Sequence, residues 1–176
     1  MPIPMNAPES VRTWRDVDLT GKCASQQHFP DLCELVGRPK PVGVDKTGKS
    51  FTFERGAAKR SGDDGWADVW KKGFFGWEYK GEHRDLDAAC KKLLDYREDL
   101  GDPPLLVASG MDRTIVQTNF TATPLEKHEI ALSQLGDPRN LEILNAVFHH
   151  PDRLRPGRTS EAITTDAPKR IVRSPT

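Results

Sequence analysis

The chain contains 176 residues, and its 26 lysines and arginines balance its 26 aspartates and glutamates. This length suits one domain with a single hydrophobic core and excludes two large domains. The zero net charge excludes a global basic surface for nucleic acid, so local clusters would have to provide such binding. No apolar run approaches the ~18 residues of a membrane span, and the N-terminus lacks the apolar core of a secretory signal. We therefore expect a cytoplasmic protein with no membrane partner, whose cysteines are buried or free thiols.

The N-terminal part is predicted to be helical after a loose, proline-containing start over residues 1–11. A short helix is expected within residues 12–20, where Trp14 and Leu19 would pack on the body of the protein. From Ala24 to Val36 apolar residues recur at helical spacing, which predicts a second helix that begins or kinks at Pro30.

A turn-rich segment then leads into the first strand. Asp45-Lys46-Thr47-Gly48 predicts a hairpin turn, and Phe51-Thr52-Phe53 predicts a strand. Residues 57–64 are small, charged and glycine-containing, so we expect a loop or a loosely ordered strand end.

The central stretch, residues 65–81, is predicted to be a β-hairpin, because two runs rich in aromatic and β-branched residues flank Lys71-Lys72-Gly73. On the second run Glu78 and Lys80 share one face of the strand, and the other face carries Phe75, Trp77 and Tyr79. A three-residue loop over 72–74 would place Asp68 directly opposite Glu78. Since like charges opposite each other destabilise a strand pair, this arrangement favours a hard divalent cation between the two carboxylates.

The second half of the chain predicts a βαβ unit followed by further helices. A helix is expected over residues 85–99 with Asp85 as its N-cap, and a buried strand follows at Leu105–Ala108. Residues 114–118 alternate and would extend the sheet. The predicted fold class is therefore α/β, with a central mixed sheet flanked by helices. Residues 125–135 predict a helix or a short adapter, and another helix is expected to start at Asp137-Pro138.

Several motifs resemble those of a known enzyme family. Asp68, nine intervening residues and Glu78-Tyr79-Lys80 resemble the PD-(D/E)xK nuclease signature. The wider sequence resembles MmeI-like (Type IIG/IIL) restriction–modification enzymes, in which an N-terminal nuclease domain is fused to an adenine-N6 DNA methyltransferase. This likeness covers roughly residues 12–165, and its segments are, in order, Thr52-Phe53-Glu54-Arg55-Gly56, Gly65-Trp66-Ala67-Asp68, Gly76-Trp77-Glu78-Tyr79-Lys80, Asp95-Tyr96-Arg97 and Pro103-Pro104-Leu105-Leu106-Val107.

The resemblance implies a fold, a domain division and a function. It implies a restriction-endonuclease-like core over residues 12–123, a helical connector over 124–150 and a loosely ordered tail over 151–176. The implied function is a Mg²⁺-dependent DNA endonuclease of a restriction–modification or phage-defence system, with Mn²⁺ as an alternative ion. The chain would be the N-terminal part or a remnant of a fused nuclease–methyltransferase, because its sequence contains no NPPY-type methyltransferase motif.

The resemblance also implies roles for individual residues. Asp68, Glu78 and the backbone carbonyl of Tyr79 would hold the metal ion, and Lys80 would orient or deprotonate the attacking water. Candidate DNA contacts are the surrounding basic and aromatic residues Lys59, Arg60, Lys71, Lys72, Arg84, Lys92 and Tyr96. Tryptophans 66, 70 and 77 would either stack on bases or fill the core beneath the hairpin.

Two other interpretations stay open. The hairpin can be an ordinary exposed one with a surface Glu–Lys pair. Alternatively, the chain is a weakly active or inactive nuclease-fold module that binds double-stranded DNA or docks with a separate methyltransferase or specificity protein. Two departures from the family pattern favour this second alternative: residues 20–23 carry no carboxylate, and Lys92 stands where related RecB-like nucleases carry glutamine.

Overall fold

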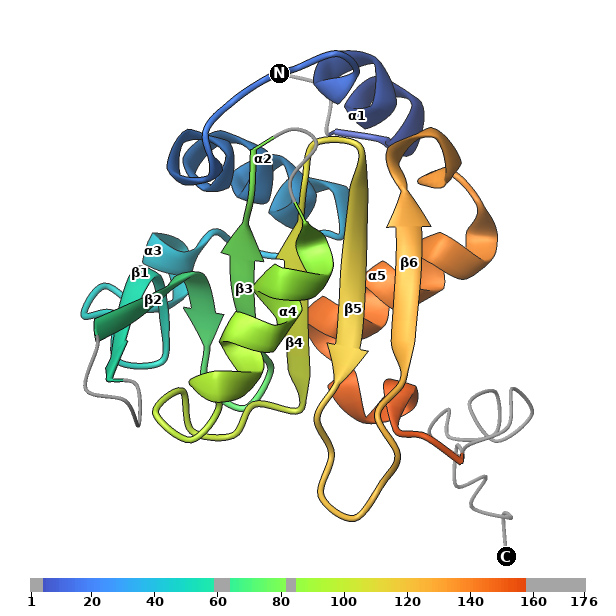
Figure 1. Ribbon diagram of the computed structural model, residues 1–176. Helices are drawn as coiled ribbons and strands as arrows, with labels where there is room; N and C mark the ends of the chain where they lie inside the picture. The colour runs from blue at the N-terminus through green and yellow to red at the C-terminus, as the bar shows by residue number, and fades with distance from the viewer. Residues whose placement is uncertain (1–4, 59–63, 82–84, 158–176) are drawn as a thin grey trace, which may run out of the picture.

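The computed structural model describes residues 5–58, 64–81 and 85–157. One mixed β-sheet lies at the centre of this part of the chain. Its strands lie side by side in sequence order (Figure 1). They are β1 Phe51–Ala58, β2 Asp64–Lys71, β3 Phe75–Tyr79, β4 Leu105–Ser109, β5 Arg113–Thr118 and β6 Lys127–Ala131. β3 and β4 are parallel, and all the other neighbouring pairs are antiparallel. The predicted α/β class with a mixed sheet is confirmed.

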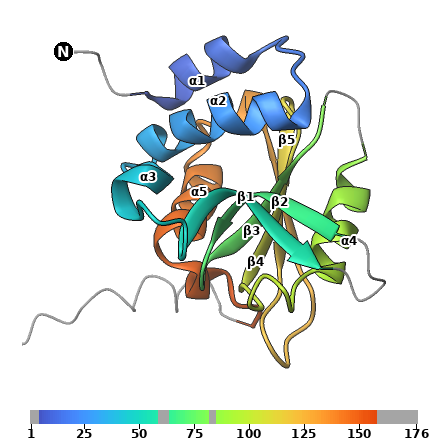
Figure 2. The same ribbon diagram turned by 90° about the vertical axis from the view of Figure 1, so that its left-hand side faces the viewer.

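Helices cover both faces of the sheet, as the two views show (Figures 1 and 2). One face carries α2 and α5, and the opposite face carries α4, which packs on β3 and β4. The α-helices are α1 Ala7–Trp14, α2 Gly21–Leu35, α3 Pro41–Val44, α4 Leu86–Asp95 and α5 Pro138–His149, and two short 3₁₀ helices are η1 Leu132–Gln134 and η2 Pro151–Leu154. Among the described helices, none is long and apolar enough to cross a membrane.

The central hairpin forms with the predicted three-residue loop. Lys71 pairs with Phe75, so residues 72–74 make the turn, and Gly73 supplies the positive φ of 75° that the turn needs. β3 is then connected through α4 to the parallel strand β4, as predicted. Asp85 caps α4 by accepting a hydrogen bond from the Ala88 amide.

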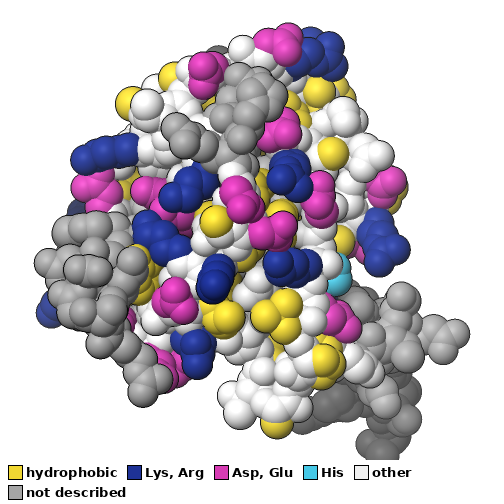
Figure 3. Space-filling model, viewed as in Figure 1, with side chains coloured by type: hydrophobic (Ala, Val, Ile, Leu, Met, Phe, Trp, Pro, Cys, Tyr) yellow, Lys and Arg dark blue, Asp and Glu magenta, His cyan; other side chains and the backbone are white. Residues whose placement is uncertain are grey.

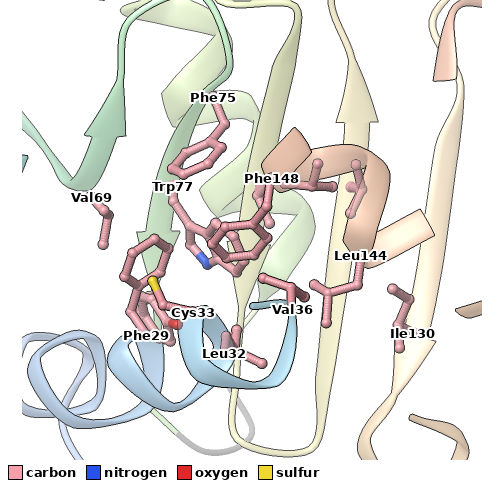
Figure 4. Packing of buried hydrophobic residues seen from close by; sticks show 14 of the residues in the cluster. Phe29, Leu32, Cys33, Val36, Val69, Phe75, Trp77, Ile130, Leu144 and Phe148 are labelled. Atoms are coloured by element: carbon pink, nitrogen blue, oxygen red, sulfur yellow. The ribbon is translucent and has the colours of Figure 1, made fainter. Parts of the chain in front are cut away.

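The main core lies between the sheet and helices α2 and α5 (Figure 4). Phe29 of α2 makes an edge-to-face contact with Trp77 of β3, and their ring centroids lie 5.2 Å apart. Phe148 of α5 packs against both rings. Trp77 also donates its indole N–H to Ser109 Oγ, which satisfies the polar end of a fully buried ring. The aromatic face of β3 is therefore the centre of this core.

The N-terminal helices begin earlier than predicted. The expected helix over 12–20 is wrong in position, because α1 starts at Ala7, within the segment assigned to a loose start. Asn6 caps it by accepting a hydrogen bond from the Glu9 amide, and the proline of its first turn is tolerated there because that position needs no amide donor. Similarly, α2 starts at Gly21 and continues through Pro30 rather than beginning at it.

Two further predictions need correction. Residues 127–131 form the edge strand β6 rather than a helix, because their alternation buries Ile130 while Lys127 and Glu129 stay exposed. Asp45 does not make a hairpin turn. Its carboxylate accepts hydrogen bonds from four backbone amides of residues 47–51, which shapes the connection from α3 into β1. The helix predicted from Asp137-Pro138 is confirmed as α5, which shares the main core with α2.

The contact between the start of α2 and the end of β3 gives a testable prediction. A Cβ added at Gly21 would collide with the carbonyl oxygen of Tyr79. We expect Gly21→Ala to lower the free energy of unfolding by about 1–3 kcal/mol, because backbone must move to admit the methyl group.

The matched control is Gly43→Ala in α3, where the new methyl group meets only an ordinary contact 3.6 Å from Pro39. This variant should be neutral or slightly stabilised. Urea denaturation followed by circular dichroism measures both, and equal stabilities would contradict the close approach.

Candidate functional site

The predicted catalytic residues lie on the face of the hairpin that α4 covers. The alternation of β3 sends Phe75, Trp77 and Tyr79 into the main core. Gly76 and Glu78 point the other way, since Gly76 faces Leu93 and Leu100, and Glu78 contacts Lys92 of α4. The separation of an aromatic face from a charged face is confirmed.

Asp68 approaches β3 where the two strands diverge. The ladder ends at the pair Val69 and Trp77, and the same register places Asp68 opposite Glu78, as predicted. Beyond this point a side chain replaces the backbone pairing, because Asp68 Oδ2 accepts a hydrogen bond of 2.6 Å from the Tyr79 amide. The carboxylate of Asp68 is thereby fixed beside the site.

Tyr79 is held in place from the other side of the sheet. Its hydroxyl forms a 2.9 Å hydrogen bond with Nδ1 of His28 on α2. Burial lowers the pKa of His28 to about 4, so the imidazole is neutral near pH 7. The Tyr79 side chain therefore anchors β3 to α2 while its backbone amide positions Asp68.

Glu78 is a buried carboxylate with two ammonium partners. Its side chain is 6% exposed, and its Oε1 lies 2.7 Å from Lys92 Nζ and 3.3 Å from Lys80 Nζ. Its other oxygen, Oε2, is buried and has no hydrogen-bond partner among the described residues. An unsatisfied buried carboxylate oxygen is energetically costly, so this atom marks a position where a cation or donor would be stabilised.

The charge of Glu78 affects the titration of Asp68. Burial and, to a smaller extent, the negative charge of Glu78 raise the pKa of Asp68 to about 6. The Tyr79 amide, Lys92 and Lys80 oppose this increase. A divalent cation between the two side chains would relieve the repulsion that Glu78 exerts on Asp68.

The residues present suit a single divalent cation. The buried Oε2 of Glu78, which has no hydrogen-bond partner among the described residues, and the carboxylate of Asp68 are hard oxygen ligands of the type that Mg²⁺ and Mn²⁺ prefer. The carbonyl of Tyr79, the third predicted ligand, faces the start of α2 at Gly21. Within the described parts of the chain, no group of three or more His, Cys, Asp or Glu side chains is placed to hold a metal. A site built here would rest on two side chains, with backbone and water as the other ligands.

A third carboxylate, which the sequence did not single out, lies next to this pair on β1. Glu54 sits between the paired residues Phe53 and Arg55, at the register position opposite Asp68. Its φ of 56° is unusual for a residue other than glycine and interrupts the ladder there. Its Oε1 lies 2.9 Å from Nζ of Lys22 at the start of α2, the segment that carries no carboxylate. An alternating strand pattern gives no indication of such a backbone kink.

Some of the residues predicted to contact DNA lie at the site, and others do not. Lys92 lies at the site. Lys71 packs its ammonium over Phe74 near the turn, and Lys72 is exposed in the turn itself. Tyr96 is 1% exposed, so its ring belongs to the core beneath α4 rather than to a DNA surface. Three candidates fall outside the described residues: Lys59, Arg60 and Arg84.

The tryptophans whose side chains are described are core residues. Trp70 is 4% exposed and donates its indole N–H to the Leu100 carbonyl, and Trp77 is fully buried. They are therefore not placed to stack on bases. The side chain of Trp66 lies outside the described residues.

The surface around α4 does not form a single basic patch. Figure 3 shows basic and acidic side chains mixed over this face, outside the atoms drawn in grey. One example is the 2.8 Å ion pair between Lys127 of β6 and Asp87 of α4. Among the described residues, electrostatic attraction of a phosphate backbone would therefore depend on a few lysines near the site.

Comparison of the chain with protein-family models, with curated proteins and with solved structures finds no match.

The raised pKa of Asp68 predicts a pH dependence of stability. The folded protein holds the Asp68 proton more tightly than the unfolded chain, so folding loses stability as pH rises from about 4 to above 6. Asp68→Asn removes this loss while keeping an acceptor for the Tyr79 amide. We measure the difference in melting temperature, variant minus parent, in EDTA at two pH values. We expect this difference to be more positive at about pH 7.5 than at about pH 4.

Asp95→Asn is the control, because Asp95 is an exposed carboxylate of α4. Its effect on the melting temperature should vary less between the two pH values. Thermal unfolding followed by circular dichroism measures both variants, and a pH-independent effect of Asp68→Asn would contradict the raised pKa.

Proposed function

We propose that this chain is a metal-dependent DNA endonuclease module of PD-(D/E)xK type from a restriction–modification or phage-defence system. One observation carries the proposal: Asp68 and Glu78 face each other across the hairpin, and Lys80, just beyond the end of β3, lies beside Glu78. The ordered segments that resemble MmeI-like enzymes support the same class, and they run through β1, β2, β3 and β4.

The residues of the site would have different roles in phosphodiester hydrolysis. Asp68 and Glu78 would hold Mg²⁺ or Mn²⁺, which when bound supplies polarisation of the phosphate and acidification of a water. Lys80 lies beside Glu78, and its role in this proposal would be to orient the attacking water. The Tyr79 amide keeps the Asp68 carboxylate directed into the site. Water adds to phosphorus, and the bond to the leaving sugar oxygen breaks.

A second function has support from the charges at the site. The ammonium groups of Lys80 and Lys92 already compensate the carboxylate of Glu78. The start of α2 offers no carboxylate that could bind a metal ion, and its Lys22 forms an ion pair with Glu54. These features favour a module that has kept the fold but lost efficient cleavage. Such a module would bind double-stranded DNA or dock with a separate methyltransferase or specificity protein.

A cleavage assay separates the two functions. Purified protein is incubated with plasmid and linear DNA in Mg²⁺, in Mn²⁺ and in EDTA. We expect nicking or cleavage that needs the metal and that falls by about 100-fold or more in Asp68→Ala and in Lys80→Ala, because each removes a group that acts on the reacting atoms.

Lys49→Ala provides the matched control, because Lys49 is an exposed lysine in the turn before β1, away from the site. Its cleavage rate should equal that of the parent. DNA that stays intact under every metal condition would overturn the endonuclease proposal. If the intact DNA is nevertheless bound, the docking function is supported.

A further inference from the structure

Lys92 makes the shortest polar contact of the buried Glu78 carboxylate. Its Nζ lies 2.7 Å from Oε1, whereas Lys80 Nζ lies 3.3 Å from the same atom. The two lysines also come from different elements, since Lys80 follows β3 and Lys92 belongs to α4. The Lys92 contact therefore depends on how α4 packs against the sheet.

α4 holds the backbone of Lys92 in a defined place. The helix is capped by Asp85, and its inner face buries Leu86, Ala89, Cys90 and Leu93. The Lys92 side chain itself is 30% exposed, so its ammonium can leave Glu78 for solvent without unpacking the helix. The helix therefore fixes the backbone of Lys92, while the ammonium at the end of its side chain is partly exposed.

A divalent cation and the Lys92 ammonium compete for the same carboxylate. Glu78 can coordinate a metal through both oxygens only if Oε1 is released from Lys92. If the metal used Oε2 alone, two positive groups would lie on one buried carboxylate and repel each other in a medium of low dielectric constant. In either case metal binding has to overcome the Lys92 contact.

We propose that Lys92 is an internal counter-cation that weakens and thereby regulates metal binding at the Asp68–Glu78 site. In the metal-free protein it stabilises the buried Glu78 charge, and a divalent cation must displace or repel it. The inference rests on the proposed metal-dependent function, and it identifies Lys92 as a positioning residue for Glu78. This role differs from that of Lys80, which lies two residues after Glu78, just beyond the end of β3.

Metal affinity without DNA tests this role directly. Isothermal titration of Mn²⁺ into the full chain is compared for the parent, Lys92→Met, Lys92→Arg and Lys91→Met. We expect Lys92→Met to lower the Kd for Mn²⁺ by about tenfold, because one positive charge next to the ion is removed. Lys92→Arg keeps the charge and should bind like the parent. Lys91 is the exposed neighbour of Lys92 on α4, so Lys91→Met should leave the Kd unchanged.

Thermal unfolding supplies a second readout. Without metal, Lys92→Met should melt at a lower temperature than the parent, because the buried Glu78 carboxylate loses its nearest partner. Saturating Mn²⁺ should then raise the melting temperature of Lys92→Met more than that of the parent, since tighter binding to the folded state stabilises it more. If Lys92→Met does not fold, Lys92→Gln replaces it, and the same tightening is expected because glutamine donates a hydrogen bond without a charge.

The outcomes separate the inference from the function on which it rests. Equal or weaker Mn²⁺ binding in a folded Lys92→Met or Lys92→Gln, alongside metal-dependent cleavage by the parent, overturns the role of Lys92 and leaves the nuclease proposal intact. Absence of Mn²⁺ binding in every variant overturns both. Tight binding in the charge-removed variants with weak binding in the parent supports the role of Lys92, whether or not the parent cleaves DNA.

Discussion

The candidate site depends on compensating one buried negative charge. The Glu78 side chain is 6% exposed, and an unpaired carboxylate at that depth would destabilise the fold by several kcal/mol. Lys80 and Lys92 compensate it through the same oxygen, Oε1, which leaves Oε2 without a partner among the described residues. The protein's own lysines therefore compensate the Glu78 charge, and one buried carboxylate oxygen is left as the position where a cation or donor would be stabilised.

The same hairpin builds the core and the site. One face of β3 buries Phe75, Trp77 and Tyr79 against α2 and α5, and the other face presents Glu78 to α4. Because strand side chains alternate, a one-residue slip in register would exchange the aromatic and charged faces. The aromatic packing thus fixes the register that brings Asp68 opposite Glu78. Tyr79 contributes to both the core and the site, since its hydroxyl is hydrogen-bonded to His28 and its backbone amide donates a hydrogen bond to Asp68.

Sequence reasoning recovered the features that local patterns encode. Alternation and turn chemistry predicted the hairpin, its three-residue loop and the face shared by Glu78 and Lys80. Long-range contacts were missed, because no local pattern places Lys92 of α4 on Glu78 or gives Glu54 a positive φ opposite Asp68. β6 was not predicted: Leu125, Ile130, Leu132 and Leu135 suggest a helix or a short adapter, whereas only pairing with β5 selects the extended form.

In our proposals, the endonuclease and docking functions would differ in one quantity, the free energy of exchanging the Lys92 ammonium on Glu78 for a divalent cation. A buried ion pair that is easily exchanged leaves a functional metal site whose occupancy follows the metal concentration. A pair that is too stable leaves a folded, charge-compensated module that binds without cutting. Glu54 occupies the register position opposite Asp68, and its carboxylate forms an ion pair with Lys22. Under these proposals, the arrangement of lysines around the carboxylates, more than the carboxylates themselves, would decide which of the two functions the module performs.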